Sequence, residues 1–365
     1  MGQGKSRVKT RFRGATGISY GLVVGLIAVV AITAITTSGS SIRALFTETS
    51  DTLEEVNGSA ASDGAPESSA VPSPSASPLF EFTSHTFTSC GQTGRTGPSE
   101  SACETAYSGA GLWVTDNALY TVSGGIQTWT VPETADYRIT AVGARGGVTS
   151  SGSAGQGATI LGTFSLTEGD QIKILVGQPG TDNSGENCDS GGGGGSFVSD
   201  ASNTPLIVAG GGGGAGTNSH SGQNGVNAGL TETPTGNASC TRDIGAAATG
   251  GNGGPAGCCS LGSGGGGFFS NGATSDHGSN IPGGTSFVGG GNGGSGNDAN
   301  ANGGFGGGGG GHGNCHIGSG PGGGYNGGRS SEDCGGGGGG SFNAGGDPAT
   351  GSFNNGSGSV TIKKM

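Results

Sequence analysis

The sequence is poor in the side chains that fill most globular cores. Of its 365 residues only 30% are hydrophobic and 5% aromatic, and two are tryptophan. Length alone predicts about two domains. So little apolar material, however, cannot fill cores of ordinary density along the whole chain. The composition therefore predicts one modest apolar core joined to a body of another kind.

Charge is also scarce, and it is unevenly distributed. Charged residues make up 11% of the chain, and the formal net charge is −11. No acidic residue precedes Gly14, whereas five of the 14 basic residues do: Lys5, Arg7, Lys9, Arg11 and Arg13. The rest of the chain is strongly acidic, and nucleic acids bind to a basic face. We therefore expect no nucleic-acid partner.

Cysteine is absent from the first 89 residues. All eight cysteines follow: Cys90, Cys103, Cys188, Cys240, Cys258, Cys259, Cys315 and Cys334. An even number confined to one part of the chain, beyond an apolar segment, indicates disulfides formed in an oxidising compartment. The residues themselves leave the pairing open. The adjacent Cys258 and Cys259 are expected to join separate partners, because a ring between neighbours is strained.

Glycine is what the sequence has in excess, with 90 residues. Its longest runs are Gly191 to Gly195, Gly210 to Gly214, Gly264 to Gly267, Gly306 to Gly311 and Gly335 to Gly340. Such runs either are flexible filler or form extended threefold helices that lie side by side. Apolar residues follow the runs and cysteines interrupt them, which favours order. We expect glycine helices over about 191–346, bonded sideways through their backbones.

The amino-terminal region contains one long apolar segment. Residues 18–37 carry no charge, and about 20 helical residues span roughly 30 Å, the hydrocarbon thickness of a bilayer. The basic flank would stay in the cytoplasm, which predicts a single-pass membrane protein with its carboxyl-terminal part outside. A cleaved secretory signal is the alternative. Apolar residues recur on one helical face as far as Val56, so the predicted helix covers 15–56.

The residues around the start of this helix resemble a known processing site. The run from Arg13 through Gly14, Ala15 and Tyr20 to Leu22 resembles that of Flp-type pilins, the small subunits of tight-adherence pili. The resemblance covers about 10–56. It implies a basic leader, 1–14, that a prepilin peptidase removes between Gly14 and Ala15. It also implies that 15–56 contacts pilus subunits or the membrane.

One position departs from that pilin pattern. Ser19 stands where the family usually has a glutamate, whose carboxylate is thought to pair with a neighbouring subunit in the apolar filament core. Losing that partner leaves a charge unpaired, which favours a rare or terminal subunit over the repeating one. A plain membrane anchor is the alternative.

A spacer and then a series of strands follow the helix. Residues 57–78 are small, polar and proline-rich, typical of an extended linker. Short runs rich in β-branched and aromatic residues then alternate with turn residues, which predicts an antiparallel β-sandwich. The expected strands lie near 80–90 and at 126–130, 137–142, 158–166, 171–176, 205–209 and 359–363. They place sandwich strands at about 79–209 and 351–364, with the glycine body inserted between them.

The region 79–365, here called the head, resembles a second family. Its ordered motifs include FTSCG at 87–91, GIQTWTVP at 125–132, ILVGQ at 174–178, PLIVAG at 205–210 and YNGG at 325–328. These resemble the extracellular glycine-rich domain of anaplastic lymphoma kinase and leukocyte tyrosine kinase. The resemblance implies a tumour-necrosis-factor-like sandwich carrying polyglycine II helices, a Cys90–Cys103 disulfide, and an extracellular recognition head. The ligand of those receptors is not implied here.

Reactive constellations are few. His312, Cys315 and His316 are candidate metal ligands; a disulfide cysteine beside exposed histidines is the alternative, because no fourth ligand has recognisable spacing. Phe268 and Phe269 are either core residues or surface anchors. We find no convincing nucleophile–base pair, and expect neither an enzyme nor a cofactor.

Two functions fit these features. The first is a pilin-like adhesin, or a minor or tip pilus subunit, whose head binds an unknown surface receptor, protein or glycan. It would lie on the cell membrane or on an extracellular pilus. The second is a membrane-anchored structural protein of the envelope or extracellular matrix with no specific receptor.

Overall fold

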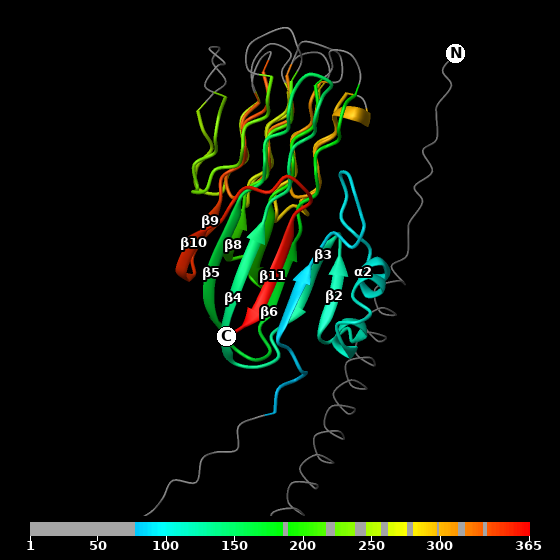
Figure 1. Ribbon diagram of the computed structural model, residues 1–365, viewed down its shortest axis with the longest axis vertical. Coiled ribbons are helices and arrows are strands. Elements are labelled where there is room, and N and C mark those ends of the chain that lie inside the picture. The colour runs from blue at the N-terminus through cyan, green and yellow to red at the C-terminus, as the bar shows by residue number, and fades with distance from the viewer. Residues whose placement is uncertain are drawn as a thin grey trace, which may run out of the picture. The chain divides into compact units, whose positions relative to one another are not determined.

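The computed structural model describes residues 77–184, 189–216, 223–237, 246–256, 262–275, 280–297, 299–312, 318–330 and 334–365. These residues belong to one compact unit that begins at Ala76 and ends at Met365. Strands fill one half of this unit, and glycine-rich segments fill the other (Figure 1), where the described residues form no strand and only one short 3₁₀ turn. The predicted leader and helix (1–14 and 15–56), and the spacer up to residue 76, lie outside the described residues.

The strands form two sheets, in which every pairing is antiparallel. The order is β1-β11-β4-β5-β10 in one sheet and β2-β3-β6-β7-β8-β9 in the other. The strands of the first sheet are β1 (Ser84–Phe87), β4 (Ala135–Val142), β5 (Thr159–Leu166), β10 (Gly346–Thr350) and β11 (Ser359–Lys364). Those of the second are β2 (Tyr120–Ser123), β3 (Ile126–Thr130), β6 (Gln171–Leu175), β7 (Ser196–Asp200), β8 (Pro205–Ala209) and β9 (Phe342–Asn343).

Short helical turns occupy the connections. The helix α2 (Glu100–Ala106) begins at Ser99, whose side chain caps the first turn by accepting from the N–H of Ala102. The 3₁₀ turns η1 (Leu112–Thr115) and η2 (Ala299–Ala301) complete the set. A disulfide between Cys90 and Cys103 ties the chain after β1 to α2, as the resemblance predicted.

Alternating side chains close the sandwich. In β4 the inward residues Tyr137, Ile139 and Ala141 are fully buried, and β4 and β5 pack against β7 and β8 of the other sheet. Gln127, also fully buried, uses its amide to join three elements. Its Oε1 accepts from the hydroxyls of Tyr107 (3.0 Å) and Tyr120 (2.8 Å), and its Nε2 donates to the carbonyl of Thr88 (2.9 Å). The amide of Gln127 is therefore satisfied within the core, whereas the buried Nε1 of Trp129 has no hydrogen-bond partner among the described residues.

The glycine-rich half is held by lateral backbone hydrogen bonds that recur every third residue. Gly212 and Ala215 donate to the carbonyls of Ala144 and Gly147, three residues apart on both segments. A second series has the same three-residue spacing: the N–H groups of Gly143, Gly146 and Thr149 donate to the carbonyls of Ala158, Gly155 and Gly152, respectively. A period of three means that every third residue of each segment faces the same neighbour.

The segment 190–195 lies at the centre of this body, here called the glycine bundle. It exchanges backbone hydrogen bonds with six other segments, at 144–147, 178–181, 212–215, 303–304, 306–309 and 320–323. A Cβ built on Gly192 would lie 1.8 Å from the carbonyl oxygen of Pro321. Backbones packed this closely around Gly192 leave no room for a Cβ, so only glycine allows the segments to lie in contact there.

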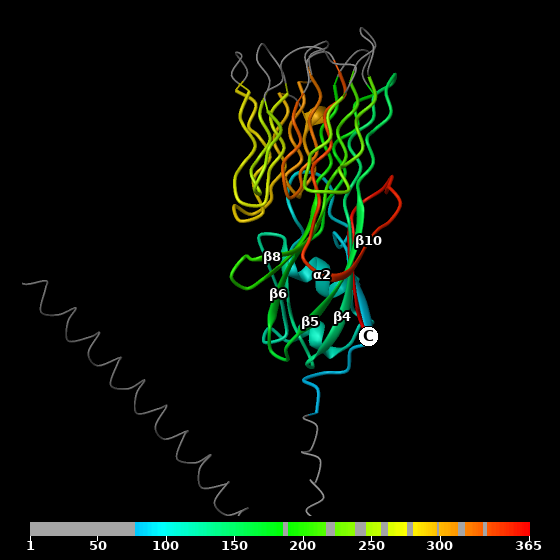
Figure 2. The same cartoon turned by 90° about the vertical axis from the view of Figure 1, so that its left-hand side faces the viewer.

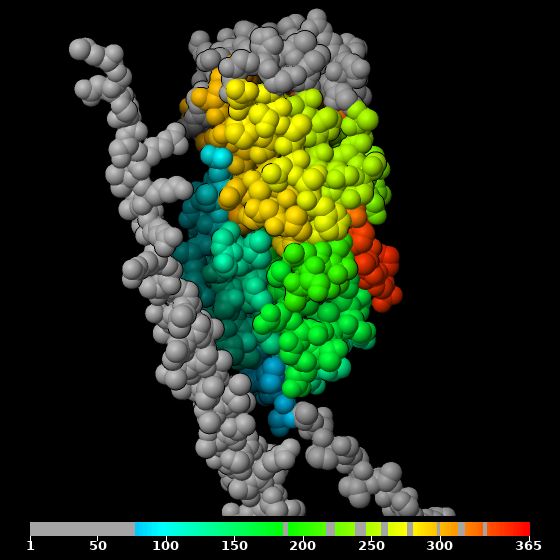
Figure 3. Space-filling model, turned by 180° about the vertical axis from the view of Figure 1, so that it is seen from behind, coloured from blue at the N-terminus to red at the C-terminus, as the bar shows by residue number. Residues whose placement is uncertain are grey.

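Aromatic residues next to or near glycine runs fasten the bundle to the six-stranded sheet. Leu175, Phe197 and Val208 point away from the sandwich core and form a second buried cluster. Residues from the glycine-rich segments cover them: Phe268, Phe287, Phe305 and Tyr325. Strands β6 to β8 are therefore buried on both faces around Leu175, Phe197 and Val208. Figure 2 shows the bundle continuing from the strand half, and Figure 3 shows the yellow segments directly above the green strands.

The structure confirms the mainly β, antiparallel sandwich and corrects its boundaries. The sandwich resumes at Phe342 and not near 351, because β9 and β10 pair with β8 and β5. The bundle also includes residues 143–158 and 177–181, outside the predicted interval 191–346. Glycines there are interspersed among larger residues, so no run announces them. The tumour-necrosis-factor-like classification and the polyglycine II geometry stay predictions.

Candidate recognition site

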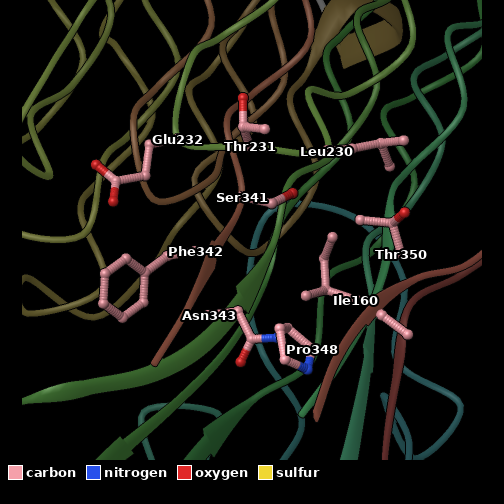
Figure 4. Close-up of a pocket in the computed structure, with 10 residues that line it drawn as sticks. Ile160, Leu230, Thr231, Glu232, Ser341, Phe342, Asn343, Pro348 and Thr350 are labelled. Atoms are coloured by element: carbon pink, nitrogen blue, oxygen red, sulfur yellow. The ribbon is translucent and has the colours of Figure 1, made fainter. Parts of the chain in front are cut away.

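The open edge of the sandwich contains a pocket of about 360 Å³, here called the edge pocket. It lies where the two sheets end in β9 and β10, and the segment 230–232 from the bundle closes it (Figure 4). Its apolar walls are Ile160, Leu230, Phe342, Pro348 and Ala349. A cavity of this size falls within the range of small ligand sites.

Hydrogen bonds within the chain fix the walls of the edge pocket. The Ser341 hydroxyl donates to the carbonyl of Gly229 (2.6 Å) and accepts from the N–H of Gly210 (3.0 Å). The Asn343 amide donates to the carbonyl of Leu161 (2.6 Å) and accepts from the N–H of Gly345 (2.9 Å). These two polar side chains therefore position the pocket rather than offer binding groups to a ligand.

Glu232 brings a negative charge to this pocket. Ion pairs within the described part of the chain join Arg145 to Asp182 and Lys364 to Glu133, and neither involves Glu232. Burial, together with the Glu232 carboxylate, raises the pKa of Tyr325 above its usual range. The Tyr325 ring stacks on Phe342 with centroids 4.5 Å apart. A carboxylate beside stacked aromatic rings suits an apolar group that bears a positive charge.

No pattern in the sequence points to the edge pocket. Its residues come from β5, β9, β10 and the bundle, and no short motif connects them. One signal was available, because Glu232 is the only Asp, Glu, Lys or Arg residue between Asp200 and Arg242. A lone charge in so long an uncharged stretch is unusual, but only the fold shows what surrounds it.

The structure separates the two candidate aromatic anchors. Phe268 is completely buried in the second cluster, so it is not a surface anchor. Its neighbour Phe269 is 47% exposed and rests edge-on against the Phe268 ring at 4.8 Å. Val288, 43% exposed, follows the buried Phe287. Only Phe269 therefore remains a candidate anchor at the surface.

Most of the remaining candidate residues lie outside the described residues. The cysteines and histidine concerned are Cys188, Cys240, Cys258, Cys259, Cys315 and His316. Cys334 is described and is disulfide-bonded, and its partner is not among the described residues. His312 is only 6% exposed and approaches the side-chain amide of Asn297 at 3.3 Å, so the expectation of an exposed histidine was wrong there. The residues that the structure describes include no group of three or more metal-ligating side chains.

The amino-terminal candidates are likewise outside the description. Gly14 and Ala15, the predicted cleavage residues, and the apolar segment 18–37 all precede residue 77. Within the ranges described, no helix has the length and apolar character needed to cross a bilayer.

The described unit is thus a β-sandwich module with a glycine bundle attached to one of its sheets. Comparison with known proteins adds what the fold alone does not define. Residues 12–53 match the Flp/Fap pilin component family. The chain is also 40% identical over 98 residues to the leukocyte tyrosine kinase receptor of Mus musculus. That match covers 26% of this chain but only 11% of the receptor. The chain therefore combines a pilin-family segment with a partial homologue of a receptor.

Proposed function

We propose that this protein is a pilin-like cell-surface adhesin, or a minor or tip pilus subunit, that presents the head as a recognition module. One observation carries the proposal: a pilin-family segment at 12–53 and a compact unit from Ala76 to Met365 belong to one chain. Pilin segments support display at the cell surface. The partial likeness to a receptor supports a recognition role for what is displayed, although it leaves the ligand open.

Processing and assembly follow from the pilin segment. A prepilin peptidase would cleave between Gly14 and Ala15, and residues 15–56 would pack against pilus subunits or span the membrane once. The head would then lie outside the cytoplasm, held away from the membrane or filament by the spacer 57–78. Ser19, in place of the usual glutamate, favours a minor or terminal position, because a rare subunit does not repeat the missing charge pair.

The head would act as a rigid scaffold. The three-residue recurrence of lateral hydrogen bonds supports polyglycine II helices, whose period is three residues per turn. Rigid elements hold binding groups more precisely than mobile loops do. The edge pocket and Phe269 are the binding features we assign to this scaffold, since the pocket is concave and Phe269 offers an exposed aromatic ring.

Deleting residues 81–365 tests the proposal against the structural alternative. The shortened chain keeps the pilin segment and the spacer. If the head is an adhesin, cells that express it lose surface attachment while their envelope and filaments persist. If the head is a structural component of the envelope or matrix, the deletion instead weakens cell integrity. Retained attachment with an intact envelope would contradict the adhesin assignment.

A further inference from the structure

The side of the glycine bundle is hollowed along two adjoining recesses of about 660 and 680 Å³. They share Asn224, Gly225 and Asn227, and together we call them the amide groove. Most of the other side chains along it are polar, including Ser153, Gln156 and Asn355. Among the described residues, no acidic or basic side chain lines either recess. Residues 77–365 as a whole carry 19 acidic and 8 basic residues.

The three-residue period of the bundle aligns the asparagines. The backbone N–H groups of Ser153 and Gln156 donate to Oδ1 of Asn224 and Asn227, both at 2.9 Å. The N–H groups of Gly225 and Ala228 donate back to the carbonyls of Ser153 and Gln156. Every contact recurs after three residues on both segments. At about 3.1 Å per residue, the two asparagines stand about 9 Å apart on one face.

These bonds leave the amide donors in fixed positions. Oδ1 of each asparagine is bound to the neighbouring backbone, which restricts the orientation of the side chain. Within the described residues no acceptor bonds Nδ2 of Asn224 or Asn227, and no partner bonds the Gln156 side-chain amide. Groups that are held before a ligand arrives lose little entropy when it binds.

The lining selects the chemistry of a ligand. An acidic polymer or a nucleic acid would require cations, and a basic peptide would require carboxylates; neither lines the groove. An apolar segment would require apolar walls, which among the described lining residues come from Val148, Ala154 and Val226. Sugar hydroxyls both donate and accept, so they satisfy amide and hydroxyl groups without any charge. Repeated donors also suit a ligand made of repeated units.

We propose that the amide groove binds an uncharged glycan chain. This inference rests on the proposed role of the head as a recognition module, and it specifies the class of receptor. Nδ2 of Asn224 and of Asn227 donate to hydroxyl groups of successive parts of the chain, while Gln156 and Asn355 supply further donors and acceptors. The groove is separate from the edge pocket, since they share no lining residue.

The test uses substitutions that remove a donor but keep the structural bond. In Asn224→Asp and Asn227→Asp a carboxylate oxygen still accepts from the backbone N–H, whereas the amide donor becomes a charged acceptor. Asn117→Asp is the matched control, because Asn117 is exposed and lies outside the groove. The full-length protein, in a sugar-free detergent, is applied to an array of neutral oligosaccharides that includes maltohexaose, cellohexaose, chitohexaose and mannohexaose, with alginate as the acidic comparison.

We expect the unmodified protein to bind at least one neutral oligosaccharide and not alginate. Each groove variant should weaken this binding at least tenfold, with an unchanged thermal midpoint, while Asn117→Asp stays within twofold. Absence of binding to every neutral oligosaccharide, equal binding to alginate, or unaffected binding by both groove variants would overturn the inference.

Failure of the groove assignment and failure of the proposed function give different results. If the purified protein binds a neutral glycan but deletion of residues 81–365 leaves attachment intact, the adhesin assignment fails and the groove assignment stands. If the deletion abolishes attachment and no neutral glycan binds, the groove assignment fails and the adhesin stands.

Discussion

At the scale of single residues, the glycines of the bundle are set by contact between backbones. Gly192 illustrates this, because a Cβ there would meet a carbonyl oxygen of another segment and not a side chain that can turn away. A backbone oxygen in a hydrogen-bonded segment moves only if its neighbours move too. Glycine therefore occupies this position because it has no side chain.

Gly192→Ala should destabilise the folded head by about 3 kcal/mol, the upper end of the usual cost of overpacking, because the backbone atoms around it cannot move apart singly. Gly109→Ala is the control, because a Cβ at that position meets nothing within 4 Å and its φ is not in the left-handed region. Its effect should stay within about 0.5 kcal/mol. Denaturant unfolding followed by circular dichroism measures both. Equal effects would show that the bundle tolerates side chains.

His85 provides a pH-dependent prediction at the same scale. It lies among Phe87, Tyr107 and Trp113, with ring centroids 4.5 to 5.2 Å away, and burial lowers its pKa from 6.5 to about 4. Between these two values the unfolded chain binds the proton and the folded chain does not. Folding stability should therefore fall as the pH falls from about 6.5 to 4.

An NMR titration of the His85 ring should give a midpoint near pH 4. The variant His85→Phe cannot bind the proton, so it should lose the part of the acid destabilisation that falls in this window. A midpoint near 6.5, or an unchanged pH dependence in the variant, would contradict the burial of this ring.

At the scale of elements, the structure explains why apolar residues follow glycine runs. The outer faces of β6, β7 and β8 present Leu175, Phe197 and Val208, and the phenylalanines of the bundle cover them. The run and the residue that ends it have different tasks. The glycines allow the backbones of neighbouring segments to lie in contact. The aromatic side chains pack against the six-stranded sheet and so attach these segments to it.

The adjacent Phe268 and Phe269 separate fastening from surface contact. Phe268→Ala should cost about 3 to 5 kcal/mol of folding stability, as expected for a fully buried phenylalanine. Phe269→Ala should cost less than about 1 kcal/mol, because nearly half of its surface is exposed. Thermal unfolding of the two variants measures the difference. If Phe269 is also a binding anchor, its variant lowers attachment without lowering the unfolding midpoint.

The sequence predicted the elements that depend on local pattern. The runs at 126–130, 205–209 and 359–363 became β3, β8 and β11, with β11 one residue longer, because short runs rich in β-branched residues favour strands on their own. It missed β10, whose residues GDPAT contain a left-handed Asp347 and a proline. Such a strand forms because β5 is present to pair with it. It also missed α2, a short helix stabilised by its cap and a disulfide.

The candidate binding sites were harder to predict than the strands, because tertiary structure brings their residues together. The edge pocket and the amide groove each join residues more than 100 positions apart. The hydrogen bonds that align Asn224 with Ser153 connect residues 71 positions apart. A period of three within one segment is visible in the sequence, but the partner segment is not. Composition identified a glycine body, and only the fold shows which polar side chains it aligns.

At the scale of the whole molecule, two parts with different relatives share one chain. Residues 12–53 match a pilin component family, and a 98-residue stretch matches a receptor of which the chain spans about a tenth. The proposed function joins these parts: the first places the second outside the cell. That account depends on processing of the leader, because prepilin cleavage distinguishes a pilin subunit from a plain membrane anchor.

The most direct measurement is the amino-terminal sequence and intact mass of the protein recovered from sheared cell-surface material. The account predicts a chain that begins at Ala15 and is released together with the pilus fraction. A chain that begins at Met1 and stays with the membrane after shearing would contradict it. The head would then be displayed by an uncleaved anchor and not by a pilus.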